Sequence, residues 1–217
     1  MSNKQIKSKE RVAEHGEVFT NEREVKAMCD LVDNETQRID SRFLEPACGD
    51  GNFLAEILNR KLNIVSKKYK KSSYDWERNS LLALGSMYGV DILIDNVKAC
   101  RERLFEMWQK EYKKICKKEC NDDTKESAKF ILNKNIVCGN ALNLKCVDKD
   151  ANETQMPIVF SEWTFPFNDA RIQRKDYTFE ELIENDTKAK NQIAINDEVD
   201  NSKFIEQYIC HYRQLSK

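Results

Sequence analysis

The chain has 217 residues, of which 40% are hydrophobic, so it can bury one sizeable core but has little room for a second large domain. Its 36 lysine and arginine residues balance 37 acidic residues, and the net charge of −1 excludes a global basic field for holding nucleic acid. No stretch approaches the roughly 18 uninterrupted apolar residues of a membrane span, and the first residues lack the apolar run of a signal peptide. We therefore expect a cytoplasmic protein with no membrane partner.

The eight cysteines do not indicate a metal site. They are scattered, and the spacing from Cys116 to Cys120, Cys138 and Cys146 does not match the paired short spacings of zinc modules. Only two histidines are present to supplement them. We expect no bound metal, and reduced, mostly buried thiols.

Two segments are locally rich in lysine, residues 60–71 and residues 110–118. A solvated helix face is the simpler interpretation of each segment taken alone. Any contact with DNA must therefore be local or belong to a partner.

Residues 1–40 are expected to form an N-terminal arm and a helix. The first 15 residues are charged and suggest a loose arm, and Asn21 offers an N-cap with Glu24 three positions later. The following helix is predicted to carry an apolar face made of Val25, Met28, Leu31 and Val32.

Residues 41–165 alternate between predicted strands and helices. Strands are expected at 42–45, 87–92, 135–138 and 157–160, and helices after Phe53, at 76–86 and at 96–118, with a lysine- and serine-rich insertion at 66–75. This alternation predicts an α/β, Rossmann-like fold whose mainly parallel sheet is flanked by helices and binds its ligand at the carboxyl ends of the strands.

Residues 166–217 are expected to form a polar, helical tail. Helix-like runs occur near residues 179–186 and 204–215, and no further apolar strand stands out.

The segment from Phe43 to Leu54 carries the strongest functional signal. Gly49 and Gly51 allow a tight turn from strand to helix and let a ligand approach the main chain. Free N–H groups at the start of the following helix favour an anionic group such as a carboxylate.

This segment, Glu45-Pro46-Ala47-Cys48-Gly49-Asp50-Gly51-Asn52-Phe53, resembles the first cofactor motif of the N6-adenine DNA methyltransferases, which use S-adenosylmethionine. Residues 16–20 are similar to the N-terminal cofactor motif of that family. The resemblance implies that Phe19 and Thr20 line the methionine end of the cofactor. It also implies that the amino acid portion lies among Glu45, Pro46, Ala47, Gly49 and Gly51.

Two further strand ends match the family. Asp91 stands where a carboxylate is expected to hold the ribose diol by two hydrogen bonds, and Ile92 is expected to pack against the adenine. A helix cap is the simpler alternative for such an acid, a part that Asp95 is also placed to play. Asn140, followed by Ala141, replaces the aspartate of a Gly-Asp-Ala-Leu motif, and its amide oxygen can still accept from the adenine amino group.

The resemblance breaks after the fourth predicted strand. Family members carry Asn-Pro-Pro-Tyr there, which binds and activates a flipped adenine, whereas this chain has Ser161, Glu162, Trp163 and Thr164. Ser161 stands at the head position, Glu162 offers an acceptor and Trp163 a stacking face, so these three are the predicted catalytic residues. The same residues also fit a hydrophobic plug over a closed pocket.

The resemblance covers residues 11–160 and leaves too few residues for a target-recognition domain. It implies an S-adenosylmethionine-dependent DNA adenine-N6 methyltransferase, or the methylase subunit of a restriction-modification system, which reaches DNA through a partner subunit or a second copy. The alternatives are a catalytically inactive cofactor-binding subunit and a methyltransferase acting on RNA or protein.

Overall fold

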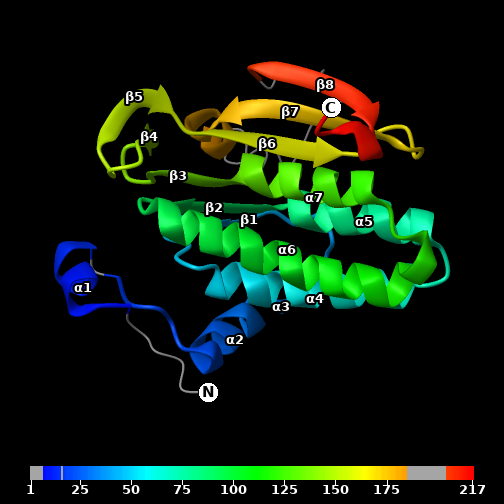
Figure 1. The fold of residues 1–217 in the computed structure, drawn as a ribbon, viewed down its shortest axis with the longest axis horizontal. Helices are drawn as coiled ribbons and strands as arrows, with labels where there is room; N and C mark the ends of the chain where they lie inside the picture. Colours follow the sequence, from blue (N-terminus) through cyan, green and yellow to red (C-terminus); the bar gives the residue numbers. More distant parts are fainter. Residues whose placement is uncertain (1–6, 16, 185–203) are drawn as a thin grey trace, which may run out of the picture.

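The computed structural model describes residues 7–15, 17–184 and 204–217. It is an α/β fold with a mixed five-stranded sheet, of order β1-β2-β3-β4-β5, beside a three-stranded antiparallel sheet of order β6-β7-β8 (Figure 1). The α/β prediction is therefore confirmed at this level, with a main sheet that is only partly parallel.

The helices and strands have the following bounds. The helices are α1 (Lys9–His15), α2 (Glu22–Asp30), α3 (Asp33–Thr36), α4 (Asn52–Tyr69), α5 (Ser73–Gly85), α6 (Ile94–Cys116) and α7 (Asp122–Asn135), with 3-10 helices η1 (Lys117–Glu119) and η2 (Tyr212–Gln214). The strands are β1 (Phe43–Glu45), β2 (Met87–Asp91), β3 (Ile136–Asn140), β4 (Lys145–Val147), β5 (Glu153–Pro157), β6 (Val159–Thr164), β7 (Arg171–Thr178) and β8 (Glu206–His211). Residues 179–184 are also helical.

Strands β1, β2 and β3 form the parallel part of the main sheet. Leu44 pairs with Tyr88, and Val90 pairs with Val137. Parallel neighbours require long crossover connections, which α4 and α5 supply between β1 and β2, and α6 and α7 between β2 and β3. The carboxyl ends of the three strands therefore meet at one edge.

The helical side of this sheet holds the larger core. Trp76 stacks on Tyr112 with ring centroids 5.4 Å apart, and Trp108 packs beside both rings. The buried indole N–H groups are satisfied, because Trp76 donates to Ser66 at 3.1 Å and Trp108 donates to Ser80 at 3.0 Å. These contacts join α4, α5 and α6 into one layer.

The other side of the sheet is covered by the second sheet, which corrects the prediction for the fourth strand. β6 is not a neighbour of β1 to β3; it pairs antiparallel with β7, with Phe160 opposite Tyr177. Tyr88 and Val90 of β2 pack against Phe160 and Tyr177. The physical reason is local, because a short connection lets β6 fold back on β7 as a hairpin, whereas β4 and β5 extend the main sheet beyond β3.

The prediction of a helical tail without strands is wrong in two places. Residues 171–178 form β7, and residues 206–211, expected to be helical, form β8. Most β8 side chains are exposed, so the sequence lacks the apolar alternation that marks a half-buried strand. Residues 179–184 are helical as predicted, and the remaining predicted helical residues up to 186 lie outside the described part.

The end of the chain is fastened to the helical layer by a buried carboxylate. Glu77 of α5 accepts hydrogen bonds from Tyr112 of α6, from Tyr212 at 2.6 Å and from Arg213 at 2.7 Å. A fully buried carboxylate is tolerated only when it is well paired, and here three donors satisfy it. The last residues are thus part of the fold.

The buried face of α2 differs from the predicted one. Asn21 caps the helix as expected, accepting from the N–H of Arg23 at 2.9 Å. Val25 and Cys29 face the core, whereas Met28 is 53% exposed and Leu31, just past the helix end, is 85% exposed. The predicted face omitted Cys29, whose thiol packs as a small apolar group four residues after Val25.

Two further predictions from composition concern the cysteine thiols and membrane-spanning segments. All eight cysteines are free, and four of them are buried. Across the described ranges, no helix combines the length and apolar character needed to cross a membrane.

Candidate functional site

A cavity of about 620 Å³ opens at the carboxyl ends of β1, β2 and β3. It is lined by Glu17, Val18, Phe19, Thr20, Glu45, Pro46, Ala47, Cys48, Gly49, Asn52, Phe53, Asp91, Ile92, Leu93, Asn96, Gly139, Asn140, Ala141 and Leu142. Ten of the eleven predicted cofactor-binding residues are in this set, and Gly51 is the exception. Four segments far apart in the sequence therefore meet around one space.

The glycine turn between β1 and α4 depends on both glycines. Gly49 and Gly51 have positive φ values of 53° and 88°, which side chains rarely adopt. A Cβ atom on Gly49 would lie 2.9 Å from the ring of Phe19, and one on Gly51 would lie 2.7 Å from the sulfur of Cys100. Gly49 thus admits the N-terminal segment to the cavity, while Gly51 lets α6 pack behind the turn.

Asp91, the last residue of β2, holds this turn in place. Its Oδ2 atom accepts from the N–H of Gly49 at 2.9 Å, and its Oδ1 atom accepts from Leu93 N at 2.9 Å and from Asn96 Nδ2 at 3.2 Å. A carboxylate offers about four acceptor positions. Three are used within the protein, so Asp91 retains capacity for one further hydrogen bond rather than the predicted pair.

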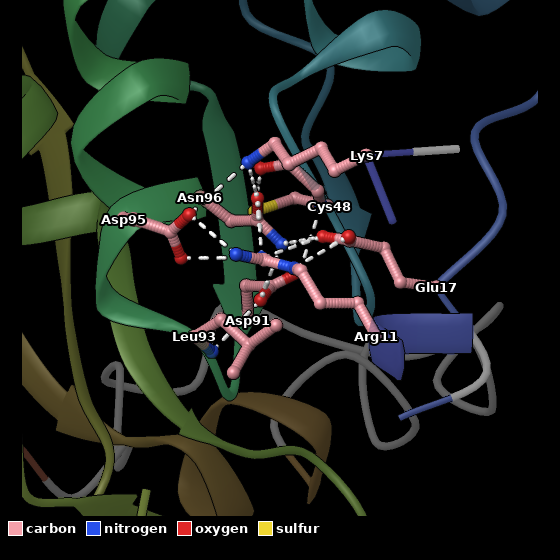
Figure 2. A network of polar contacts seen from close by, with 9 residues as sticks. Lys7, Arg11, Glu17, Cys48, Asp91, Leu93, Asp95 and Asn96 are labelled. Atoms are coloured by element: carbon pink, nitrogen blue, oxygen red, sulfur yellow. Dashed lines mark hydrogen bonds and ion pairs between the residues drawn. The ribbon is translucent and has the colours of Figure 1, made fainter. Parts of the chain in front are cut away.

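A polar network on the cavity rim ties the N-terminal arm to the start of α6, as Figure 2 shows. Arg11 of α1 donates to Glu17 at 2.7 Å and to Asp95 at 2.7 Å. Asn96 donates to Glu17 at 2.7 Å, and Lys7 pairs with Asp95 at 3.2 Å. The arm is therefore latched beside the residues that line the cavity, and Asp95 serves the latch rather than a helix cap.

The charges of this network shift the acids toward their ionised forms. The Arg11 guanidinium lowers the pKa of Asp95 to about 2. Burial acts to raise the pKa of Glu17, but hydrogen bonds from Arg11 and Asn96 outweigh it, so the pKa is lowered. Both carboxylates remain charged at neutral pH and keep the arm in place.

Asn140, at the end of β3, is oriented by two contacts. Its Nδ2 group donates to Glu153 at 2.9 Å, and its Oδ1 atom accepts from the N–H of Leu142 at 3.0 Å. An amide oxygen has two lone pairs, so one remains for a ligand donor. Leu142, which follows on the same loop, is 96% exposed at the rim of the cavity.

The cavity carries an acidic charge pattern. Three lining residues, Glu17, Glu45 and Asp91, are acids, and none of the described lining residues is lysine or arginine. Burial raises the pKa of Glu45, although the N–H of Ala47 acts in the opposite direction. Since a half-buried carboxylate gains stability from a nearby cation, Glu45 favours a positively charged ligand group.

The predicted catalytic residues lie elsewhere, on β6. Ser161 is fully buried, donates its hydroxyl to Asp176 at 2.6 Å and its backbone N–H to Asn135 at 3.0 Å. Trp163 is only 3% exposed and packs so closely on Gly85 that a Cβ atom there would lie 2.7 Å from its ring. Both side chains are parts of the core.

Glu162 faces a second hollow of about 560 Å³. It pairs with Arg42 at 3.0 Å, and Tyr177 donates to it at 3.4 Å. This hollow shares no lining residue with the first cavity. The structure therefore brings the predicted cofactor residues together and separates the predicted catalytic residues from them.

Sequence reasoning assigned no role to several cavity residues. Asn96 is 1% exposed and connects Asp91 to Glu17. An asparagine on the inward face of the first turn of an amphipathic helix is a signal that was available in the sequence. Within the described ranges, no group of three or more potential ligands is arranged to hold a metal ion.

Comparisons with protein-family models, with curated proteins and with solved structures return no match to this chain.

Proposed function

We propose that the chain binds S-adenosylmethionine in the cavity at the ends of β1 to β3 and has a Rossmann-like fold of the class I methyltransferase type. The observation that carries this proposal is a cavity lined by the carboxylates of Glu45 and Asp91, with a third acid, Glu17, paired to Arg11 on the rim, and with no lysine or arginine among its described lining residues. S-adenosylmethionine bears a sulfonium and an ammonium group against one carboxylate, so it is cationic. Dinucleotides and nucleoside triphosphates carry phosphates, for which the described lining offers no lysine or arginine as counter-charge.

The lining residues fit the parts of this cofactor. Phe19 and Thr20 would line the methionine end, and Glu45 would face its ammonium group. The N–H groups at the start of α4 would receive its carboxylate.

The nucleoside end has matching groups as well. The one acceptor position left on Asp91 would take a ribose hydroxyl, and the oxygen of Asn140 would accept from the adenine amino group. Ile92 and Leu142 would cover the two sides of the ring. When bound, the cofactor supplies an electrophilic methyl group, while the protein holds it in place and shields it from water.

The acceptor side is proposed to come from a partner. Ser161 and Trp163 are bonded or packed within the core, and Glu162 lies on a separate hollow. We therefore propose a methylase subunit of a restriction-modification system, which methylates adenine N6 in DNA together with a second polypeptide or a second copy. The burial of Ser161 and Trp163 also favours a second candidate function, a catalytically inactive cofactor-binding subunit.

The test has two stages. First, the purified chain is heated with S-adenosylmethionine, its demethylated product, NAD⁺ or ATP, and a rise in Tm is expected for the first two alone. Second, the chain is incubated with labelled donor and mixed-sequence DNA, with and without the products of neighbouring genes. Label on adenine N6 only when a partner is present supports the methylase subunit.

The other results are equally decisive. Donor binding without transfer under any partner condition supports the inactive subunit. A folded chain that shows no Tm shift with either methyl donor or product contradicts both proposals.

A further inference from the structure

The two lysine-rich segments of the sequence converge on a hollow of about 670 Å³. It is lined by residues 70–74 and 115–119, and we call it the lysine hollow. Helix α4 ends at Tyr69 and helix α6 ends at Cys116, so the hollow forms where both helices stop. The fold thus joins two patches that are 39 positions apart in the sequence, from residue 71 to residue 110.

The lysine hollow lies at the opposite end of these helices from the acidic cavity. Helix α4 begins at Asn52, which lines the cavity, and its 18 residues span about 27 Å at about 1.5 Å per residue. Helix α6 also starts beside the cavity, just after Asp91, and runs in the same direction (Figure 1). The molecule therefore has an acidic ligand space at one end and a basic hollow at the other.

The lysines around the hollow are exposed and largely unpaired. Seven of them have no carboxylate partner among the described residues, namely Lys67, Lys68, Lys70, Lys71, Lys113, Lys117 and Lys118. Lys114 alone pairs with an acid, Glu111, at 3.0 Å. Elsewhere, Lys26 and Lys125 each pair with a neighbouring acid on their own helix. Lys70, Lys71, Lys117 and Lys118 therefore place four uncompensated positive charges around one hollow of a chain whose net charge is −1.

Helix dipoles explain only part of this concentration. Lysines in the last turns of α4 and α6 offset the partial negative charge of the helix ends, an effect that falls off within the last turn. Lys70, Lys71 and Lys118 lie beyond those turns and line the hollow. Lys117 adopts a φ of 50°, which few non-glycine residues adopt, where the chain leaves α6.

We propose that the lysine hollow binds the phosphodiester backbone of a nucleic acid without sequence preference. The lysines supply the counter-charge, while the hydroxyls of Ser72 and Ser73 and the 41% exposed ring of Tyr74 add polar and stacking contacts. An anionic membrane fits less well, because the lining offers one aliphatic side chain, the half-buried Ile115, as an apolar anchor. This proposal does not depend on the proposed cofactor.

The test is fluorescence anisotropy of labelled duplex DNA and duplex RNA with the full chain, without any methyl donor, from about 50 to 200 mM salt. Two variants remove one side of the hollow each, Lys70→Gln/Lys71→Gln and Lys117→Gln/Lys118→Gln. The matched control is Lys98→Gln/Lys149→Gln, which removes two exposed lysines elsewhere that also lack a carboxylate partner among the described residues. We expect each hollow variant to weaken binding about tenfold and to lower the salt slope by about 2, and the control to stay within about twofold.

Three results would overturn the proposal. The wild type fails to bind either duplex at the lowest salt, or the control weakens binding as much as the hollow variants do. The third is lysine-dependent binding to phosphatidylserine vesicles with no binding to nucleic acid. Circular dichroism of each variant verifies that it is folded.

Discussion

Polar residues have different surroundings in two regions of the molecule. One region is the cavity at the ends of β1 to β3, and the other is strand β6. At the cavity, Glu45 is half-buried with no lysine or arginine partner among the described residues, and Asp91 keeps one acceptor position beside a space large enough for a ligand. On β6, Ser161 donates its hydroxyl hydrogen bond to Asp176, and Trp163 is packed in the core. The first region leaves polar groups available beside a cavity, whereas the polar and aromatic groups of the second are engaged inside the protein.

This difference shows that some sequence motifs determine their local geometry by themselves, whereas the role of others depends on distant segments. A glycine turn between a strand and a helix sets its local shape through φ values that side chains rarely adopt, so Gly49 and Gly51 shape the edge of the cavity wherever β1 and α4 form. The role of Ser161 depends instead on which strand lies next to it, and β7 is that neighbour.

Substitution of Gly49 by valine should have the largest effect, a loss of ligand affinity at the cavity. The new side chain would meet the ring of Phe19 and be held at a positive φ that β-branched residues avoid. We expect S-adenosylmethionine binding to weaken on the order of 100-fold or more, measured by calorimetry on material shown to be folded. Unchanged affinity would mean that the ligand lies elsewhere.

Ser161→Ala tests the other side of the comparison. Removing the hydroxyl leaves the buried carboxylate of Asp176 without one donor, so the free energy of unfolding should fall by about 1–2 kcal/mol in urea denaturation. Donor binding should stay unchanged. Thr164→Ala, at an exposed position of the same strand, is the matched control and should cost less than about 0.5 kcal/mol. If the Ser161→Ala variant kept full stability but bound S-adenosylmethionine more weakly, Ser161 would belong to the cofactor site, contrary to this account.

Glu45→Gln sharpens the electrostatic argument. The variant loses a charge-assisted contact, so donor affinity at pH 7.5 should fall about fivefold. Because burial raises the pKa of Glu45, the wild type should also bind more weakly as the pH is lowered from 7 toward 5, whereas the variant should lose this dependence. Calorimetry at several pH values checks both expectations. If the affinity of the wild type and of the variant changed with pH in the same way, Glu45 would not be the group that binds the cation.

The smallest expected effect concerns the latch on the cavity rim. Arg11 lowers the pKa of Asp95 to about 2, below its ordinary value of 3.8, so the latch is fully formed above about pH 4 and is lost as the pH falls toward 2. Hydrogen exchange of α1 should therefore accelerate over this range in the wild type, after correction for intrinsic rates. Arg11→Gln should show fast exchange throughout, a change of about 1 kcal/mol or less because Asp95 is partly exposed. Equal protection in both proteins at pH 6 would contradict the latch.

The sequence was sufficient for the parts of the fold that depend on local signals. Apolar runs located β1, β2, β3 and helices α4, α5 and α6, and the glycine motif located the turn that borders the cavity. Helix α7 was not predicted, and most of the expected insertion at 66–75 belongs to the end of α4 and the start of α5. Asp91 and Asn140 could be placed at the cavity because parallel strands end at one edge of a sheet.

What the sequence did not yield depended on contacts between distant segments or on surfaces without an apolar pattern. β5 and β8 are mostly exposed, so their sequences carry no alternation that marks a strand. The three hydrogen bonds accepted by Asp91 follow from the way Leu93 and Asn96 approach it, which spacing alone does not fix. The convergence of the two lysine segments likewise required knowing that α4 and α6 run side by side.

The most direct test of the central claim is a calorimetric titration of the folded chain with S-adenosylmethionine, with NAD⁺ as the phosphate-bearing comparison. The account predicts saturable binding of one S-adenosylmethionine per chain and no measurable binding of NAD⁺. Binding of NAD⁺, or no heat with S-adenosylmethionine and its demethylated product, would contradict an acidic cavity built for a cationic methyl donor.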